Sequence, residues 1–87
     1  MKRLIDILPT DYPYTLSGNP EIEIGELHID SRQIKPSDVF IAINGTLVDG
    51  HRFIGAAIEK GATVVVCENL PTPQPQEVTF IQTQSTI

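Results

Sequence analysis

The sequence predicts an α/β fold, with a small mixed but mostly parallel sheet, flanking helices and one strand–helix–strand crossover over residues 39–67. Two continuous apolar runs, Val39–Ile43 and Ala62–Cys67, are typical of strands buried on both faces. The stretch between them carries apolar residues at helical spacing, namely Phe53, Ile54, Ala57 and Ile58. A strand, a helix and a second strand in this order form a βαβ unit, whose crossover is right-handed.

The elements before this unit are shorter. Apolar residues recur at spacings of three and four over Leu4–Leu8, which predicts a short helix that ends before Pro9. Residues 10–20 are rich in proline, glycine and asparagine without periodicity, and they are predicted to be loop. The alternation of apolar and polar residues then changes phase at Gly25, which indicates a bulge or two short strands.

Turn and cap signals complete the order of elements. Asp49 is placed to cap the start of the helix, and Gly61 is placed to end it. The proline-rich segment Leu70–Gln76 is predicted to be a stiff surface loop, and Val78–Ile81 is predicted to be a last strand. No turn, cap or closing element follows that strand, so we expect the sequence to be cut or to continue beyond residue 87.

Composition excludes several classes of protein. The 87 residues are enough for one domain, and the net charge of −5 with scattered lysines and arginines argues against a nucleic-acid partner. The sequence has no signal-peptide pattern and no apolar run of transmembrane length, so we expect a cytoplasmic protein without a membrane partner. We expect it to be monomeric, with its single cysteine, Cys67, as a small buried hydrophobe.

Two polar loops follow predicted strands. Asp30-Ser31-Arg32 comes directly after Ile29, and residues 44–50 come directly after Ile43. Because ligands bind beyond the carboxyl ends of parallel strands, we expect the two loops to converge on one small polar ligand. The hydroxyls of Ser31 and Thr46 and the open backbone at Gly45 are suited to carbonyls, amides and hydroxyls.

Each of these polar residues also has a purely structural interpretation. For Asp30, Arg32 and Asp49 we favour hydrogen bonds that shape the loops. For Ser31 and residues 46–48 the structural and the binding interpretations stay open. The two histidines are interpreted as structural: His51 as a local hydrogen-bonding residue and His28 as a surface residue on the polar side of a strand.

The sequence contains no recognisable catalytic apparatus. It has no phosphate-binding loop, no dinucleotide fingerprint, no nucleophile elbow and no pair of histidines for a metal. We therefore predict no catalytic residue, no metal ligand and no cofactor in this chain.

The loops and the strand between them follow one ordered pattern: Asp30-Ser31-Arg32, Pro36-Ser37-Asp38-Val39-Phe40, Ala42-Ile43-Asn44-Gly45, Asp49-Gly50-His51-Arg52-Phe53 and Gly61-Ala62. This pattern resembles the amino-terminal domain of the Mur ligases of peptidoglycan synthesis. One departure is Ser37, where that family usually has glycine. We therefore expect an ordinary backbone conformation at this turn.

The resemblance implies a function for a larger parent protein. The short amino-terminal lead and the segment 45–54 resemble the ligase that adds the third peptide residue, 2,6-diaminopimelate or L-lysine, to UDP-N-acetylmuramoyl-L-alanyl-D-glutamate. In that family the substrate carboxylate is phosphorylated by ATP before the amine attacks, and ATP and magnesium are bound by a central domain. Residues 1–87 are then one UDP-sugar-binding domain without the central and carboxy-terminal domains.

The family's nucleotide-sugar contacts carry over to five positions, namely Ile29, Ser31, Thr46, Leu47 and Val48. They imply an anchor for the UDP end of the substrate, far from the reacting carboxylate. Two alternatives remain at this stage: the equivalent domain of the ligase that adds D-alanyl-D-alanine, and a small α/β module that binds a protein.

Overall fold

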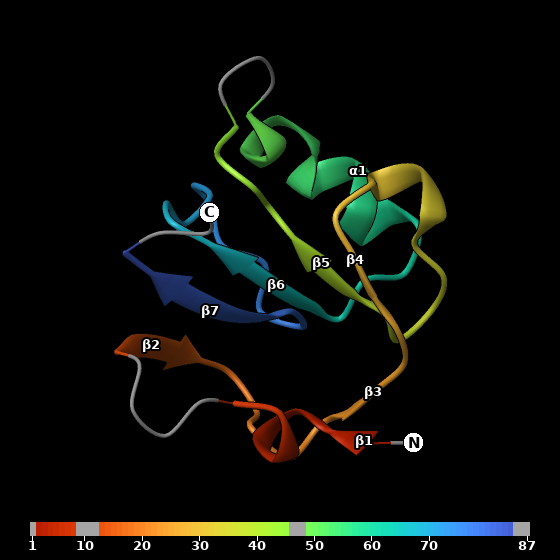
Figure 1. The fold of residues 1–87 in the computed structure, drawn as a ribbon, viewed down its shortest axis with the longest axis vertical. Coiled ribbons are helices and arrows are strands. Elements are labelled where there is room, and N and C mark those ends of the chain that lie inside the picture. The colour runs from red at the N-terminus through yellow and green to blue at the C-terminus, as the bar shows by residue number, and fades with distance from the viewer. Residues whose placement is uncertain (1, 9–12, 46–48, 85–87) are drawn as a thin grey trace.

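The computed structural model describes residues 2–8, 13–45 and 49–84 (Figure 1). The strands are β1 (Lys2–Arg3), β2 (Tyr14–Ser17), β3 (Glu23–Ile24), β4 (Leu27–His28), β5 (Val39–Ile41), β6 (Val64–Cys67) and β7 (Thr79–Thr83). The helices are the α-helix α1 (Ile54–Glu59) and three 3-10 helices, η1 (Leu4–Asp6), η2 (Ser31–Gln33) and η3 (Gly50–Phe53).

A five-stranded sheet in the order β2-β7-β6-β5-β4 forms the centre of the domain. The four strands from β4 to β7 run parallel, and β2 joins the edge antiparallel to β7. The strands β1 and β3 form a separate two-stranded ribbon. The predicted α/β class, the mostly parallel sheet and the β5-α1-β6 crossover are therefore confirmed.

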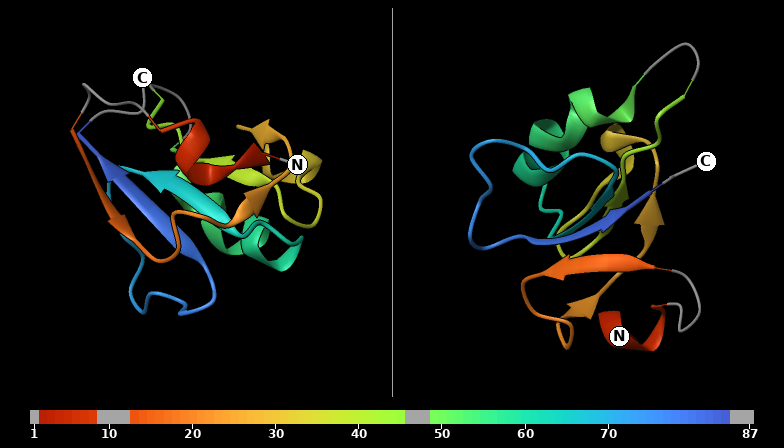
Figure 2. Two further views of the ribbon diagram at one scale, coloured as in Figure 1. Left: turned by 90° about the horizontal axis from the view of Figure 1, so that it is seen from below. Right: turned by 90° about the vertical axis from the view of Figure 1, so that its left-hand side faces the viewer.

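Alternate residues of the central strands face opposite layers, as the pleat of a strand requires. Phe40, Val65 and Phe80 belong to a core cluster with Ile54 and Ala57 of the helical layer. A second core cluster, on the other face, consists of Leu4, Ile24, Val39, Val64 and Ile81. Figure 2 shows the two coverings, with α1 on one side of the sheet and the amino-terminal η1 on the other. Burial on both faces explains why β5 and β6 read as continuous apolar runs.

The amino-terminal third differs from its prediction in two places. The helix predicted over Leu4–Leu8 is only the 3-10 turn Leu4–Asp6, because its backbone is held from outside: the N–H groups of Leu4 and Ile5 bond the carbonyls of Ile22 and Pro20. The loop predicted over residues 10–20 contains strand β2. That strand is stabilised by a partner distant in sequence, β7, so local sequence signals could not identify it.

The turn before β5 corrects another expectation. Ser37 has a φ of 75°, the left-handed region, instead of an ordinary conformation. Its backbone is fixed from two sides, since its N–H donates to the Gly61 carbonyl and its own carbonyl accepts from the Gly25 N–H. Tertiary hydrogen bonds therefore impose a glycine-like conformation on a serine.

The remaining predictions concern single features. The phase change at Gly25 corresponds to two short strands, β3 and β4, in different sheets. Gly61 follows the helix with a φ of +113°, as a residue ending a helix does. Cys67 is buried, and burial raises the pKa of its thiol to about 11. Within the described ranges, no helix is long and apolar enough to cross a bilayer.

Candidate functional site

A cleft of about 500 Å³ lies between the two polar loops, beyond the carboxyl ends of β4 and β5. Its described lining consists of Ile29, Asp30, Ser31, Arg32, Ile43, Gly50 and Phe53. The two loops therefore converge as predicted, because β4 and β5 are adjacent and parallel.

The first loop is shaped by Asp30. Its carboxylate accepts the backbone N–H of Arg32 at 2.9 Å, which caps η2, and it also accepts the guanidinium of the same residue at 2.9 Å. The Arg32 side chain is the largest cause that lowers the pKa of Asp30 to about 2. Both side chains thus hold the loop itself, as the structural interpretation predicted.

Two residues of the first loop face the cleft with different chemistry. Ile29 is 64% exposed and supplies an apolar wall, whereas Ser31 is 9% exposed and lies within the capped turn. Phe53, at the end of η3, supplies a second apolar wall and is 41% exposed. From the sequence, Phe53 was expected on one face of a helix together with Ile54, Ala57 and Ile58. The position of η3, a 3-10 turn with a different period, instead turns Phe53 toward the cleft.

The second loop is closed by the segment Asp49-Gly50-His51. Asp49 accepts the backbone N–H of His51 at 3.0 Å and its ring Nδ1 at 2.7 Å, so the predicted cap is confirmed. The backbone N–H of His51 is the largest of the causes that lower the pKa of Asp49. The segment is thus a second aspartate-capped 3-10 turn.

His51 connects this turn to the end of β6. Its Nε2 accepts the backbone N–H groups of Glu68 at 2.9 Å and Asn69 at 3.2 Å. Because Nε2 accepts twice, the neutral ring carries its proton on Nδ1 and donates it to Asp49. The interpretation of His51 as a local hydrogen-bonding residue is confirmed by its bonds to Asp49. Its bonds to the residues that follow β6 were not predicted from the sequence.

Gly50 brings the start of η3 against the end of β5. Its N–H donates to the Ile43 carbonyl at 2.7 Å, and a Cβ at this position would lie 2.7 Å from the Ile43 backbone nitrogen. Only glycine fits such a contact without movement of the backbone. The floor of the cleft therefore depends on this close approach.

Three of the predicted site residues, Thr46, Leu47 and Val48, lie outside the described residues. The described ends of their loop meet, because Asn44 and Asp49 form an antiparallel bridge. These described ends therefore lie beside Ile43 and Gly50, which line the cleft.

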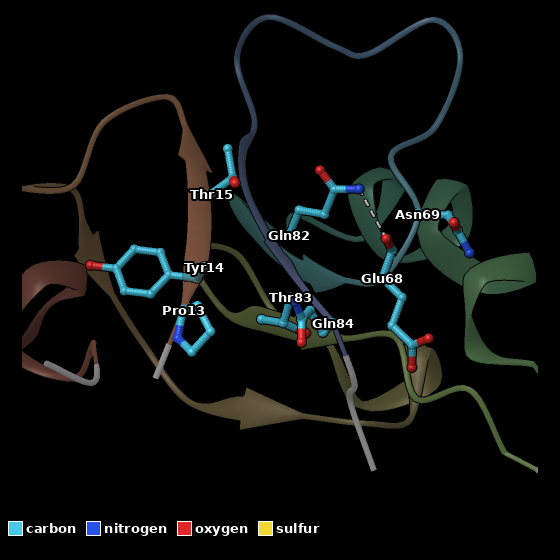
Figure 3. A pocket seen from close by; sticks show the side chains of 8 residues that line it. All are labelled: Pro13, Tyr14, Thr15, Glu68, Asn69, Gln82, Thr83 and Gln84. Carbon is cyan, nitrogen blue, oxygen red and sulfur yellow. Dashed lines mark hydrogen bonds between the residues drawn. The ribbon is translucent and has the colours of Figure 1, made fainter. Parts of the chain in front are cut away.

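A second, more polar hollow of about 480 Å³ lies along the same edge of the sheet, at the ends of β6 and β7 (Figure 3). Its lining consists of Pro13, Tyr14, Thr15, Glu68, Asn69, Gln82, Thr83 and Gln84. One hydrogen bond crosses it, from the Gln82 amide to the Glu68 carbonyl at 3.0 Å. This hollow was not predicted from the sequence, since Pro13, Tyr14 and Thr15 of its wall belong to the unrecognised strand β2 and the residue before it.

His28 also differs from its prediction. Its side chain is only 22% exposed, and Nε2 points toward the buried carboxylate of Asp38 instead of toward solvent. The neighbouring Glu26 completes a cluster of three groups able to bind a metal ion. The sequence does not indicate this cluster, because Asp38 is ten positions beyond His28 and meets it only through the parallel pairing of β4 and β5.

The structure is a small α/β domain with a cleft at the carboxyl edge of its parallel strands, and the comparisons with known proteins identify its family. Residues 23–85 match the family model described as "Mur ligase family, catalytic domain". The chain is 46% identical over 80 residues to a Bacteroides fragilis protein named UDP-N-acetylmuramoyl-L-alanyl-D-glutamate--2,6-diaminopimelate ligase, covering 92% of this chain. A Phocaeicola vulgatus protein of the same name is 48% identical over 69 residues, or 79% of this chain. The chain therefore belongs to the Mur ligase family.

Solved structures agree on the fold. The UDP-N-acetylmuramoylalanyl-D-glutamyl-2,6-diaminopimelate--D-alanyl-D-alanyl ligase of Acinetobacter baumannii superposes with a TM-score of 0.64 and 28% identity, over 77% of this chain and 14% of that one. The MurF ligase of Thermotoga maritima superposes with a TM-score of 0.61 and 26% identity, over 70% of this chain and 14% of that one. The chain spans only 16% of the Bacteroides fragilis relative and 14% of the Phocaeicola vulgatus one.

Proposed function

We propose that this domain binds the UDP-N-acetylmuramoyl end of a peptidoglycan precursor for an ATP-dependent amide ligase. The observation that carries the proposal is the cleft at the carboxyl edge of β4 and β5, which is lined by two of the inferred contact residues, Ile29 and Ser31. The other three, residues 46–48, belong to the loop whose described ends flank this cleft.

The cleft has the chemistry that a nucleotide base and its sugar require. Two apolar side chains, Ile29 and Phe53, suit the faces of a planar ring. The Ser31 hydroxyl and the backbone of the two loops suit its carbonyl and amide groups. Such contacts bind substrate and transition state equally, and so serve to position the distant reacting end.

The relatives suggest a specific parent enzyme. Two relatives that match most of this chain bear the name of the 2,6-diaminopimelate-adding ligase, and we propose that the parent adds the third peptide residue to UDP-N-acetylmuramoyl-L-alanyl-D-glutamate. Residues 1–87 then form one substrate-binding domain, and ATP and magnesium are bound by domains outside it. We propose a monomer.

The D-alanyl-D-alanine-adding ligase is the second candidate, because the superposed structures include a protein of that name. Assay of the full-length parent with two acceptors separates the two candidates. Ligation of an amino acid to the UDP-muramoyl dipeptide supports the first, and ligation of a dipeptide to the UDP-muramoyl tripeptide supports the second.

Binding by this domain is tested by titrating the ¹⁵N-labelled chain with UDP and with UDP-N-acetylmuramoyl-L-alanyl-D-glutamate. We expect amide shifts at Ile29, Ser31, Phe53 and residues 46–48. Absence of shifts at Ser31 and residues 46–48 contradicts the proposal. Shifts with the muramoyl ligand alone assign the cleft to the sugar instead of the base.

A matched pair of variants tests the apolar wall. Ile29→Asp places a charge in the cleft, whereas Ile5→Asp places the same charge on the amino-terminal 3-10 turn, at a site that is 47% exposed. We expect Ile29→Asp to weaken binding at least about tenfold, since a desolvated charge beside a ring is costly. Ile5→Asp is expected to bind as the natural sequence does. Equal binding by all three proteins contradicts the proposed wall.

A further inference from the structure

Three side chains that can bind a metal meet at the outer edge of the sheet, separate from the lining of the cleft. Glu26 precedes β4, His28 ends it, and Asp38 precedes β5. One ligand atom from each lies within 4.8 Å of the others. His28 Nε2 is 3.5 Å from Glu26 Oε1 and 3.5 Å from Asp38 Oδ2, so the imidazole nitrogen lies between two carboxylates.

The His28 nitrogen has no hydrogen-bond partner, although the atom is fully buried. A separation of 3.5 Å from both carboxylate oxygens does not meet the geometry of a hydrogen bond. It does match a metal site: bonds of about 2.0–2.2 Å to nitrogen and oxygen in a tetrahedron place the ligand atoms about 3.3 Å apart. The orphaned nitrogen is therefore aimed at a position that a cation would fill.

Asp38 is held in place independently of any metal. Its Oδ1 accepts the Glu26 N–H and its Oδ2 accepts the Lys35 N–H, each at 2.9 Å. Burial is the largest single influence and raises the pKa of Asp38, but the N–H groups of Lys35 and Glu26 together with the nearby charges of His28 and Lys35 bring the pKa below the ordinary value. Gly25 leaves the room for this arrangement, because a Cβ there would lie 2.5 Å from Asp38 Oδ1. The cluster thus has one rigid, ionised and buried ligand.

We propose that Glu26, His28 and Asp38 bind a divalent transition-metal ion of the zinc class. One imidazole nitrogen and two carboxylate oxygens form a mixed N/O set, which suits zinc and its neighbours better than calcium or magnesium. Two carboxylates beside one neutral imidazole carry a charge of about −2, which a divalent ion balances. A bound ion would fix the edge strand β4 directly before Ile29, the first residue of the cleft.

The test is a titration of the chelator-treated protein with Zn²⁺, followed by calorimetry and by ¹⁵N spectra of the histidine rings. We expect one equivalent to bind and the His28 Nε2 resonance to shift. The His51 ring serves as an internal control, because its Nε2 already accepts two backbone N–H groups. Co²⁺ in place of Zn²⁺ reports the coordination number by its visible absorption.

Substitutions identify the ligands. Glu26→Gln and His28→Gln are each expected to weaken Zn²⁺ binding by at least about tenfold, the lower end of the loss seen even for indirect metal partners. Glu26 is suited to this test because its side chain is 71% exposed, so the variant folds. Glu23→Gln, which removes another exposed carboxylate close by on β3, is the matched control and is expected to bind normally.

Several outcomes overturn the proposal. It is wrong if Zn²⁺ does not bind, if the His28 resonances do not move on binding, or if Glu26→Gln and His28→Gln bind as tightly as Glu23→Gln.

Discussion

The two loops that form the cleft use the same local device with different consequences. Asp30-Ser31-Arg32 and Asp49-Gly50-His51 each begin with an aspartate that caps a 3-10 turn by accepting the N–H two residues on. In the first turn the basic residue returns to the aspartate and stays in solvent, with the Arg32 side chain 85% exposed. In the second, the His51 side chain is 13% exposed and also bonds the end of β6.

The first turn is held by bonds within itself, between Asp30 and Arg32. The second turn is also held by a bond to a distant segment, from Glu68 to His51. Exposed ion pairs contribute little to stability, because water and salt screen them. A buried acceptor for two backbone N–H groups contributes more, since its loss leaves those donors unpaired. We therefore expect substitutions in the second turn to change stability, and substitutions in the first to change local properties.

The largest expected effect is at the middle residue of the second turn. In Gly50→Ala the new methyl group meets the Ile43 backbone 2.7 Å away, and backbone cannot move aside as a flexible side chain can. We expect a loss of about 3 kcal/mol in the free energy of unfolding, at the upper end for overpacking. Urea denaturation followed by circular dichroism measures it.

Gly55→Ala is the matched control for this substitution. Gly55 lies in α1, and nothing would lie within 4 Å of its Cβ. The same change of residue is expected to stabilise the protein by about 0.5–1 kcal/mol, because alanine favours the helix. If both variants behave alike, the close approach at Gly50 does not determine the stability of this turn.

The histidine of the second turn comes next. His51→Phe keeps a ring of similar shape but removes both nitrogens, so Glu68 and Asn69 lose the acceptor of their N–H groups. We expect a loss of about 2 kcal/mol in the free energy of unfolding. Amide hydrogen exchange at these two residues is expected to accelerate in the variant. Unchanged exchange rates would show that the connection to β6 is not maintained in solution.

The contrast between the turns also shows what the sequence could predict. The cap at Asp49 and the loop-shaping role of Asp30 were predicted, because aspartate acts on the N–H groups that follow it directly. The buried strands β5 and β6 were identified from their apolar runs. The connection of His51 to β6, strand β2 and the pairing of His28 with Asp38 were not, since each joins segments that only the sheet brings together. Phe53 was expected on one helix face with Ile54 and Ala57, because the 3-10 turn was interpreted as regular helix.

A smaller and opposite effect is expected at the turn between the first loop and β5. Ser37 has a φ of 75°, which costs a residue with a side chain about 1–2 kcal/mol, and glycine avoids this cost while losing more chain entropy on folding. We expect Ser37→Gly to stabilise the protein by about 0.5–1 kcal/mol in thermal or urea unfolding. Ser37→Ala removes the hydroxyl but keeps a side chain at the positive φ, so we expect it not to stabilise the protein. An equal gain in stability in both variants would contradict a backbone strain at Ser37.

The smallest effect is expected in the first turn, where the ion pair changes a pKa more than it changes stability. Arg32 lowers the pKa of Asp30 from 3.8 to about 2, mainly through its side chain. A lowered pKa stabilises the fold above the ordinary value, and that contribution disappears as the pH falls from 3.8 through about 2. In Arg32→Gln we expect the pKa of Asp30 to rise toward 3.8 without reaching it, because the backbone N–H of residue 32 still donates.

Carboxyl NMR titration measures this shift, with Asp49 as the internal reference whose pKa stays lowered by His51. High salt is expected to reduce the difference between the two proteins at Asp30. An unchanged pKa of Asp30 in the variant would show that the backbone N–H of residue 32, and not the Arg32 side chain, lowers it.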